Sequence, residues 1–104
     1  MQYQSTRSKI EGISAAQAIA RGLSQDGGLF VPEAMPSLTQ NDIEKLIPLS
    51  YKERAAKIMG LFLDDFSAEE LAEYTAAAYS SPSFDCDEVA PTRLFDSKTS
   101  FLEL

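Results

Sequence analysis

Apolar residues recur at helical spacing in several short stretches, each opened by a polar cap. In the first stretch, Ser14 stands at an N-cap position, and Gln17, three residues later, completes a capping box. Gly22 then occupies the place where a helix often ends on a left-handed residue. These signals predict a short helix over residues 15 to 21.

Two longer helices are predicted in the middle of the chain. Ser50 and Glu53 form one capping box. Ser67 and Glu70 form another, and each box precedes an apolar stripe. The stripe residues are Tyr51, Ala55, Ile58, Met59 and Phe62 in the first helix and Ala68, Leu71, Ala72, Thr75, Ala78 and Tyr79 in the second. We expect the two stripes to pack on each other. A briefer helix is predicted to end before Pro48.

Extended segments are predicted near both ends of the chain and after the first helix. The stretch "YQSTR", residues 3 to 7, suits an N-terminal strand. Residues 29 to 31 suit a strand that Pro32 ends or places at a sheet edge. Later, "RLF" and "SFLEL" flank "DSKT" as the two strands of a hairpin. The prediction is therefore a small, mostly helical α+β domain with a few short strands.

Length and composition are those of one folded domain. A chain of 104 residues with 44% hydrophobic and 24% charged residues resembles neither a disordered chain nor a fibrous repeat. A compact domain of this size is expected to bury about two thirds of the surface that its unfolded chain exposes. We therefore expect a sizeable core within the chain.

The acidic balance argues against several classes of partner. The formal net charge of -7 opposes contact with the phosphates of nucleic acid or of an anionic membrane. The chain has no signal-peptide pattern at its start and no apolar run of the roughly 20 residues that span a bilayer. We expect a cytoplasmic protein without nucleic-acid or membrane partners.

Few of the residue types that carry catalysis or bind metals are present. The chain has no histidine and a single cysteine, Cys86, which rules out nucleophile–histidine pairs and a structural zinc site. Cys86 is expected to be an ordinary free thiol, because its acidic neighbours disfavour a thiolate. No lysine has the apolar setting that makes an amine nucleophile. The adjacent carboxylates are expected to be solvated rather than convergent; they are Asp64 and Asp65, and Glu69 and Glu70.

One candidate binding site lies in "SQDGGLFVP", residues 24 to 32. Gly27 and Gly28 suit either a phosphate-binding loop or a tight turn in which Asp26 bonds its own turn backbone. Phosphate loops lead into a helix, whereas these glycines lead into a strand. The sequence therefore favours the turn over the phosphate loop.

A second candidate site is "STR" near the start of the chain. The hydroxyls of Ser5 and Thr6 and the guanidinium of Arg7 are groups that hold an oxyanion or a phosphate. The alternative is a strand whose polar side chains face solvent. Spacing alone favours the strand, and both interpretations stay open at this point.

Four stretches together resemble the N-terminal domain of the threonine synthase family. They are "YQSTR" at residues 3 to 7, "GLSQDGGLFVP" at 22 to 32, "LSY" at 49 to 51 and "FLEL" at 101 to 104. The most specific part is the order and spacing of Tyr3, Ser5, Thr6, Arg7, Gly22, Leu23, Asp26, Gly27, Gly28, Leu29 and Pro32. Ser8 and Ser24 replace the glycine and alanine of many members. The resemblance covers essentially the whole chain.

The resemblance implies a pyridoxal-phosphate enzyme of the tryptophan-synthase-β type that converts O-phosphohomoserine and water into threonine and phosphate. It implies that the Schiff-base lysine lies just beyond Leu104. Residues 1 to 104 would then be an accessory domain whose partner, the catalytic domain, is absent. We expect this chain alone to hold no catalytic residue and to bind no cofactor.

The resemblance also favours Ser5, Thr6 and Arg7 as residues that face the substrate of the full enzyme. An alternative from another class is a complete small protein that keeps this domain as a binding or regulatory module. The strand-like ending of the sequence favours the piece of an enzyme over the module.

Overall fold

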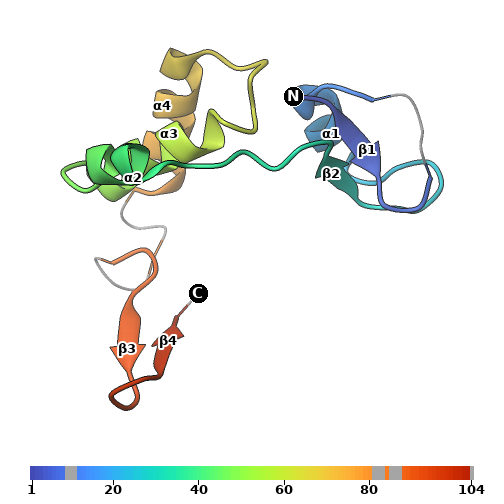
Figure 1. The fold of residues 1–104 in the computed structure, drawn as a ribbon. Coiled ribbons are helices and arrows are strands. Elements are labelled where there is room, and N and C mark those ends of the chain that lie inside the picture. Colours follow the sequence, from blue (N-terminus) through green and yellow to red (C-terminus); the bar gives the residue numbers. More distant parts are fainter. Residues whose placement is uncertain (9–11, 81–83, 85–87, 104) are drawn as a thin grey trace.

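The computed structural model describes residues 1–8, 12–80, 84 and 88–103. Its elements, in chain order, are β1 (Tyr3–Ser5), α1 (Ala15–Arg21), β2 (Phe30–Pro32), α2 (Gln40–Leu46), α3 (Tyr51–Met59), α4 (Ala68–Ala78), β3 (Thr92–Leu94) and β4 (Ser100–Leu102). Figure 1 shows the helices α2 to α4 in the middle, with a small sheet and α1 to one side and a second small sheet below. The predicted α+β class, mostly helical with short strands, is confirmed.

Within the described residues, each of the four helices begins at a capping box, which explains why so many helix starts could be predicted. The first helix covers residues 15 to 21, as predicted, and Ser14 and Gln17 exchange hydrogen bonds at its start. Gly22 closes it with a φ of 71°, in the region that favours glycine. The briefer helix α2 is capped by Thr39 and ends before Pro48.

Helices α3 and α4 pack on each other, which confirms the predicted contact between their stripes. Leu71 and Thr75 of α4 are buried, with 5% and 2% of their surface exposed. The stripe predicted for α3 is cut short, because the helix ends at Met59 and Phe62 lies in the turn that follows.

The strands form two separate antiparallel pairs among the described residues, β1 with β2 and β3 with β4. In the first, Tyr3 faces Pro32 and Ser5 faces Phe30, and Pro32 ends the strand as predicted. In the second, Arg93 faces Phe101. We call β1, α1 and β2 the amino-terminal unit, and β3 with β4 the hairpin.

The loop between α3 and α4 ties the amino-terminal unit to the helices. The hydroxyl of Tyr3 donates to the backbone oxygen of Phe62 at 3.1 Å. The backbone N–H of Ala16, in the first turn of α1, donates to Asp65 Oδ2 at 2.8 Å, and this bond lowers the pKa of Asp65. The terminal amino group of Met1 contacts Asp64. Each carboxylate thus holds a different group, and they do not converge on a common site.

The expected burial of two thirds of the surface is wrong. The chain exposes 7907 Å², so it buries only about half of the roughly 16,500 Å² expected for its unfolded chain. Its radius of gyration is 16.5 Å, against about 13 Å for a compact domain of this length. Among the described residues, the buried hydrophobic side chains are Ala15, Ala18 and Leu71. The three regions in Figure 1 therefore do not close over a common core.

Candidate functional site

Residues 24 to 28 form a tight turn that uses its own backbone donors. The N–H of Gly27 donates to the Ser24 oxygen at 2.8 Å, and the N–H of Ser24 donates to the Gly28 oxygen at 2.9 Å. The N–H of Gly28 donates to Asp26 Oδ1 at 3.0 Å. Because both glycine N–H groups bond within the turn and a carboxylate sits beside them, this segment is not a phosphate cradle.

The carboxylate of Asp26 also gathers side chains from the start of the chain. Ser5 Oγ donates to both carboxylate oxygens, at 2.8 and 2.9 Å. Ser8 Oγ donates to Asp26 Oδ2. We call Ser5, Ser8, Asp26 and Gly28 the Asp26 clasp. It joins the segment after β1 to the turn before β2 and so fixes how the two strands approach each other.

Two glycines of the turn are required for different geometric reasons. Gly27 has a φ of 76°, a conformation that side-chain-bearing residues rarely adopt. Gly28 has an ordinary φ, but a Cβ built there would lie 2.1 Å from Ser5 Oγ and 3.1 Å from the backbone nitrogen of Arg7. Gly28 therefore makes room for Ser5 to reach the carboxylate.

The hydrogen bonds of the clasp keep Asp26 ionised. The Ser8 hydroxyl, the Gly28 N–H and the Ser5 hydroxyl hold the pKa of Asp26 far below its usual range. A carboxylate that accepts this many donors is a structural anchor, and its negative charge disfavours an anionic ligand at the same place.

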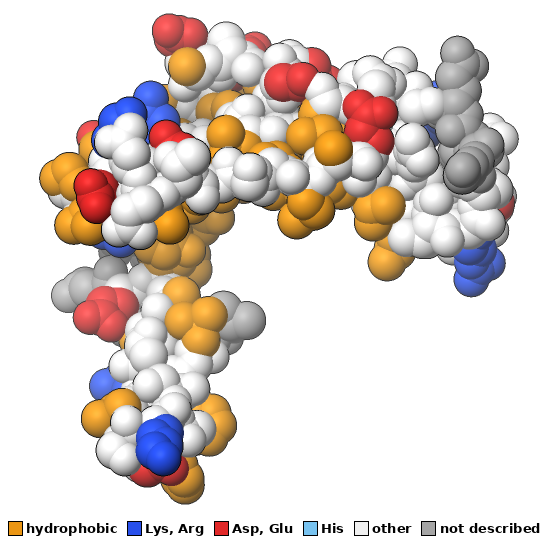
Figure 2. Space-filling view, in the orientation of Figure 1, with side chains coloured by type: hydrophobic (Ala, Val, Ile, Leu, Met, Phe, Trp, Pro, Cys, Tyr) orange, Lys and Arg blue, Asp and Glu red, His pale blue; other side chains and the backbone are white. Residues whose placement is uncertain are grey.

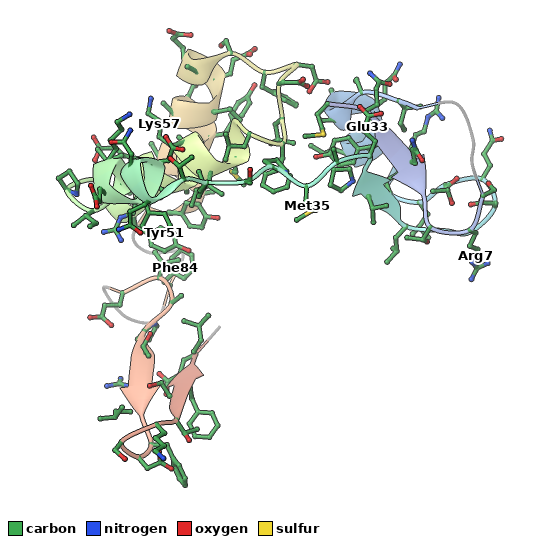
Figure 3. All side chains as sticks on the ribbon, viewed as in Figure 1. Arg7, Glu33, Met35, Tyr51, Lys57 and Phe84 are labelled. Carbon is green, nitrogen blue, oxygen red and sulfur yellow. The ribbon has the colours of Figure 1, made fainter. Side chains whose placement is uncertain are left out.

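The structure places the three candidate residues of "STR" around this clasp with unequal exposure. Ser5 is buried, and its hydroxyl is fully engaged, since it also accepts the N–H of Arg7 at 3.1 Å. Thr6 forms two hydrogen bonds with Leu29. Thr6 Oγ1 accepts the backbone N–H of Leu29 at 3.0 Å, and the backbone N–H of Thr6 donates to the backbone oxygen of Leu29. Arg7 is exposed, and its Nη1 donates to the backbone oxygen of Asp26 at 3.2 Å. Figure 3 shows the Arg7 side chain pointing outward at the edge of the amino-terminal unit.

Sequence reasoning missed that Asp26 binds the "STR" segment. It assigned Asp26 only to its own turn, because the two segments lie about twenty residues apart and nothing local links them. The signal lay in strand pairing: since Ser5 faces Phe30, the residues after β1 must meet the residues before β2. Had the antiparallel pairing of these two strands been assumed from the sequence, the contact between Asp26 and the serines could have been predicted.

Apolar side chains lie exposed on the side of the chain that faces the hairpin. Figure 3 shows Met35, Tyr51 and Phe84 on this side. Met35 exposes 75% of its surface and Tyr51 exposes 44%. Figure 2 shows that apolar patches run along the underside of the connection between the amino-terminal unit and the helices. Exposed apolar surface of this extent is typical of a face that packs against another part of a protein.

Other kinds of site are not found in the described part of the chain. No group of three or more His, Cys, Asp or Glu side chains there is arranged to hold a metal ion. Within the same residues, no helix is long and apolar enough to cross a membrane. Cys86, expected to be a free thiol, lies outside the described residues, as does Leu104.

Known proteins match this chain over nearly its whole length. The model of the family described as "Threonine synthase N terminus" matches residues 2–79. Threonine synthase from Escherichia coli is 31% identical over 105 residues, which cover 100% of this chain and 23% of that protein. Threonine synthase from Schizosaccharomyces pombe is 34% identical, covering 98% and 20%. Mouse threonine synthase-like 1 is 37% identical, covering 86% and 12%.

Solved structures agree with these matches. The structure of a pyridoxal-phosphate-bound threonine synthase from Brucella melitensis superposes with a TM-score of 0.84 at 31% identity, over 99% of this chain and 22% of that one. The structure of the E. coli enzyme superposes with a TM-score of 0.81. The chain thus spans about a fifth of the length of the threonine synthases that it matches. It belongs to the threonine synthase family and corresponds to the N-terminal domain of its members.

Proposed function

We propose that this chain serves as the N-terminal domain of an enzyme that converts O-phosphohomoserine and water into threonine and phosphate with pyridoxal phosphate. The proposal is supported by relatives described as threonine synthases, one of them with the cofactor bound. It includes the expectation that the 104-residue chain alone is inactive. The catalytic domain would be its principal partner.

The observation that carries this proposal is the large exposed surface of the chain. A compact protein of this mass exposes about 5,800 Å², so the 7907 Å² exposed here exceeds that value by about 2,000 Å². An interface that buried this excess, with an equal area on its partner, would reach about 4,000 Å² in total, within the range of obligate interfaces. The chain is thus shaped to pack on a larger body rather than to act alone.

The described residues do not fit pyridoxal phosphate. The described lysines, at positions 45, 52, 57 and 98, are exposed, whereas a lysine that binds this cofactor is held in a pocket. The glycine N–H groups that would hold its phosphate are bonded within the turn. We therefore derive no chemical step through the cofactor in this chain, and we assign its site to the catalytic domain.

Within this function we propose that Arg7 faces the substrate, with Ser5 and Thr6 supporting it. Its planar guanidinium has five N–H donors and suits a phosphate. One donor binds the Asp26 backbone oxygen, which holds the side chain over the turn. Ser5 and Thr6 act through the strand geometry, because their oxygens already accept backbone N–H groups.

Kinetics of the complete gene product test the role of Arg7. If Arg7 contacts the phosphate of the substrate, Arg7→Ala should raise KM roughly tenfold or more, and Arg7→Lys should recover part of the loss. Arg21→Ala, at the end of α1 on the same unit, is the matched control and should leave KM unchanged. Unchanged kinetics in Arg7→Ala would remove Arg7 from the proposal.

The alternative function is a stand-alone binding or regulatory module derived from this domain. The codons that follow Leu104 distinguish the two, because an enzyme requires a long continuation. The decisive assay is phosphate release from O-phosphohomoserine. We expect it from the complete gene product and not from the 104-residue chain. We also expect the chain to lack the visible absorbance of enzyme-bound pyridoxal phosphate. Turnover or that absorbance in the isolated chain would contradict the proposal.

A further inference from the structure

We propose that the hairpin is a wedge that the catalytic domain of the complete protein buries on both faces. The inference rests on the proposed function, since it takes the catalytic domain as the occupant. It goes further by stating which residues enter the interface and that the hairpin lies between two surfaces rather than on one.

The register of the hairpin assigns its side chains to two faces. Residues directly opposite each other in an antiparallel pair share a face, and neighbours along a strand alternate. Thr92 faces Leu102 and Leu94 faces Ser100. We call these four residues the leucine face. Arg93 faces Phe101 on the other side, which we call the phenylalanine face.

Two contacts confirm the membership of the phenylalanine face. The rings of Phe95 and Phe101 meet edge to face with their centroids 5.5 Å apart. Arg93 Nε donates to Glu103 Oε2 at 3.3 Å. Phe95 and Glu103 therefore lie on the same side as Arg93 and Phe101.

Both faces carry large apolar side chains that stay mostly exposed among the described residues. On the leucine face, Leu94 and Leu102 expose 75% and 59% of their surfaces. On the other face, Phe95 and Phe101 expose 70% and 57%. Figure 2 shows apolar side chains on both flanks of the projecting hairpin. Among the described elements, β3 and β4 pack substantially only on each other.

This pattern differs from that of a hairpin that lies on a surface. A sheet with one face in water alternates apolar and polar residues, whereas strands covered on both faces are apolar on both. A two-stranded hairpin without such cover is marginally stable in water. Because each face of the hairpin carries two large exposed apolar side chains beside its polar ones, each face offers apolar surface for a covering partner to bury.

The catalytic domain is the occupant that the chain itself points to. Relatives such as the E. coli enzyme carry about four fifths of their length outside the region matched here. Among the described elements the hairpin is the last along the chain, so a catalytic domain that followed it would begin beside it. The roughly 2,000 Å² of excess exposed surface is also enough for a wedge enclosed on both sides.

Limited trypsin digestion of the complete gene product tests the wedge. Trypsin cleaves after arginine and lysine, and both Arg93 and Lys98 lie in the hairpin. We expect slow cleavage at these sites in the complete protein and fast cleavage in the 104-residue chain. Leu94→Ser on one face and Phe101→Ser on the other should each speed cleavage of the complete protein roughly tenfold or more, because each removes a buried apolar side chain.

Conservative variants and the isolated chain provide the controls. Leu94→Met and Phe101→Leu keep an apolar side chain and should leave cleavage close to the wild-type rate. The serine variants should change little in the 104-residue chain, where no partner covers the hairpin.

The remaining outcomes each contradict the wedge. If only one face is sensitive, the hairpin lies on a single surface; if neither is, or if the isolated chain is already protected, the catalytic domain does not cover it. Phosphate release by the complete protein separates these failures from failure of the proposed function. A gene that ends at residue 104 would overturn both.

Discussion

The β1–β2 pair and the β3–β4 hairpin each consist of two antiparallel strands of three residues, and an aspartate steadies the turn beside each pair. Asp26 accepts two serine hydroxyls and a backbone N–H. Asp96 accepts the backbone N–H groups of Lys98 and Thr99, both at 2.8 Å, and so bonds within its own turn. The aspartate of the first pair therefore joins segments about twenty residues apart, whereas the aspartate of the second pair bonds only within its own turn.

The two strand pairs also differ in burial: the first is partly buried and the second is exposed. Ser5 of β1 is buried, and Tyr3 reaches the loop after α3, whereas every residue of β3 and β4 is exposed. Strands of equal length thus differ in what holds them, since the stability of a short sheet comes from packing and side-chain bonds around it. The amino-terminal unit is stabilised by contacts within this chain, whereas the hairpin depends on contacts with another part of the protein.

The largest effect on this contrast is expected from Gly28→Ala. The added methyl group would meet Ser5 Oγ at 2.1 Å and break the Asp26 clasp, at a cost of about 1–3 kcal/mol in the free energy of unfolding. Gly60→Ala is the matched control, because Gly60 has a helical φ of -61° and its nearest contact would be 3.4 Å. Urea denaturation of the two variants measures the difference. Equal stabilities would contradict the steric role of Gly28.

A smaller effect is expected from removing the charge of each turn aspartate. Asp26→Asn should lower the melting temperature more than Asp96→Asn, because Asp26 accepts donors from two distant serines and Asp96 only from its own turn. Circular dichroism of the 104-residue chain provides both melting curves. A larger loss in Asp96→Asn would show that the hairpin carries more of the stability than its contacts indicate.

Acid is expected to loosen the hairpin turn before the clasp. The Lys98 N–H lowers the pKa of Asp96, and the Ser8 hydroxyl is the largest of several causes that lower the pKa of Asp26 further. A carboxyl with a lowered folded-state pKa stabilises the fold above its unfolded pKa of about 3.9, and that stabilisation is lost as the pH falls through the folded value. In an NMR titration, Thr99 should therefore respond at a higher pH than Gly28. The reverse order would contradict the difference between the two turns.

The smallest effect is expected from Arg93→Ala in the hairpin. Its ion pair with Glu103 joins two side chains that are more than half exposed, and such pairs contribute about 0–1 kcal/mol. The melting curve of the 104-residue chain should barely move, and added salt should change it no more than in the unaltered chain. A loss as large as that of Gly28→Ala would mean that this pair, rather than a covering partner, holds the hairpin.

The features that could be predicted from the sequence are those set by neighbouring residues. Each capping box spans four residues, so Ser14 with Gln17 and Ser67 with Glu70 predicted the starts of their helices directly. The hairpin was equally local, since only five residues, 95 to 99, separate its two strands. The family resemblance, carried by residue order and spacing, is confirmed by the family match.

Contacts between residues far apart in the chain could not be predicted from the sequence. Asp65 is exposed, as expected, but it also accepts the N–H of Ala16, 49 positions away, which no local pattern indicated. The Asp26 clasp was missed for the same reason. The burial estimate failed because scaling with chain length assumes that a chain closes its own core, whereas the apolar faces of this one are left open.

Amide hydrogen exchange tests most directly whether the hairpin depends on a partner that the amino-terminal unit does not need. The probes are backbone N–H groups bonded across the two ends of each pair: Thr6 and Glu33 beside β1 and β2, and Phe95 and Glu103 beside β3 and β4. In the 104-residue chain we expect protection at the first two and fast exchange at the last two. In the complete gene product we expect protection at all four. Equal protection of both pairs in the isolated chain would contradict the dependence of the hairpin on the catalytic domain.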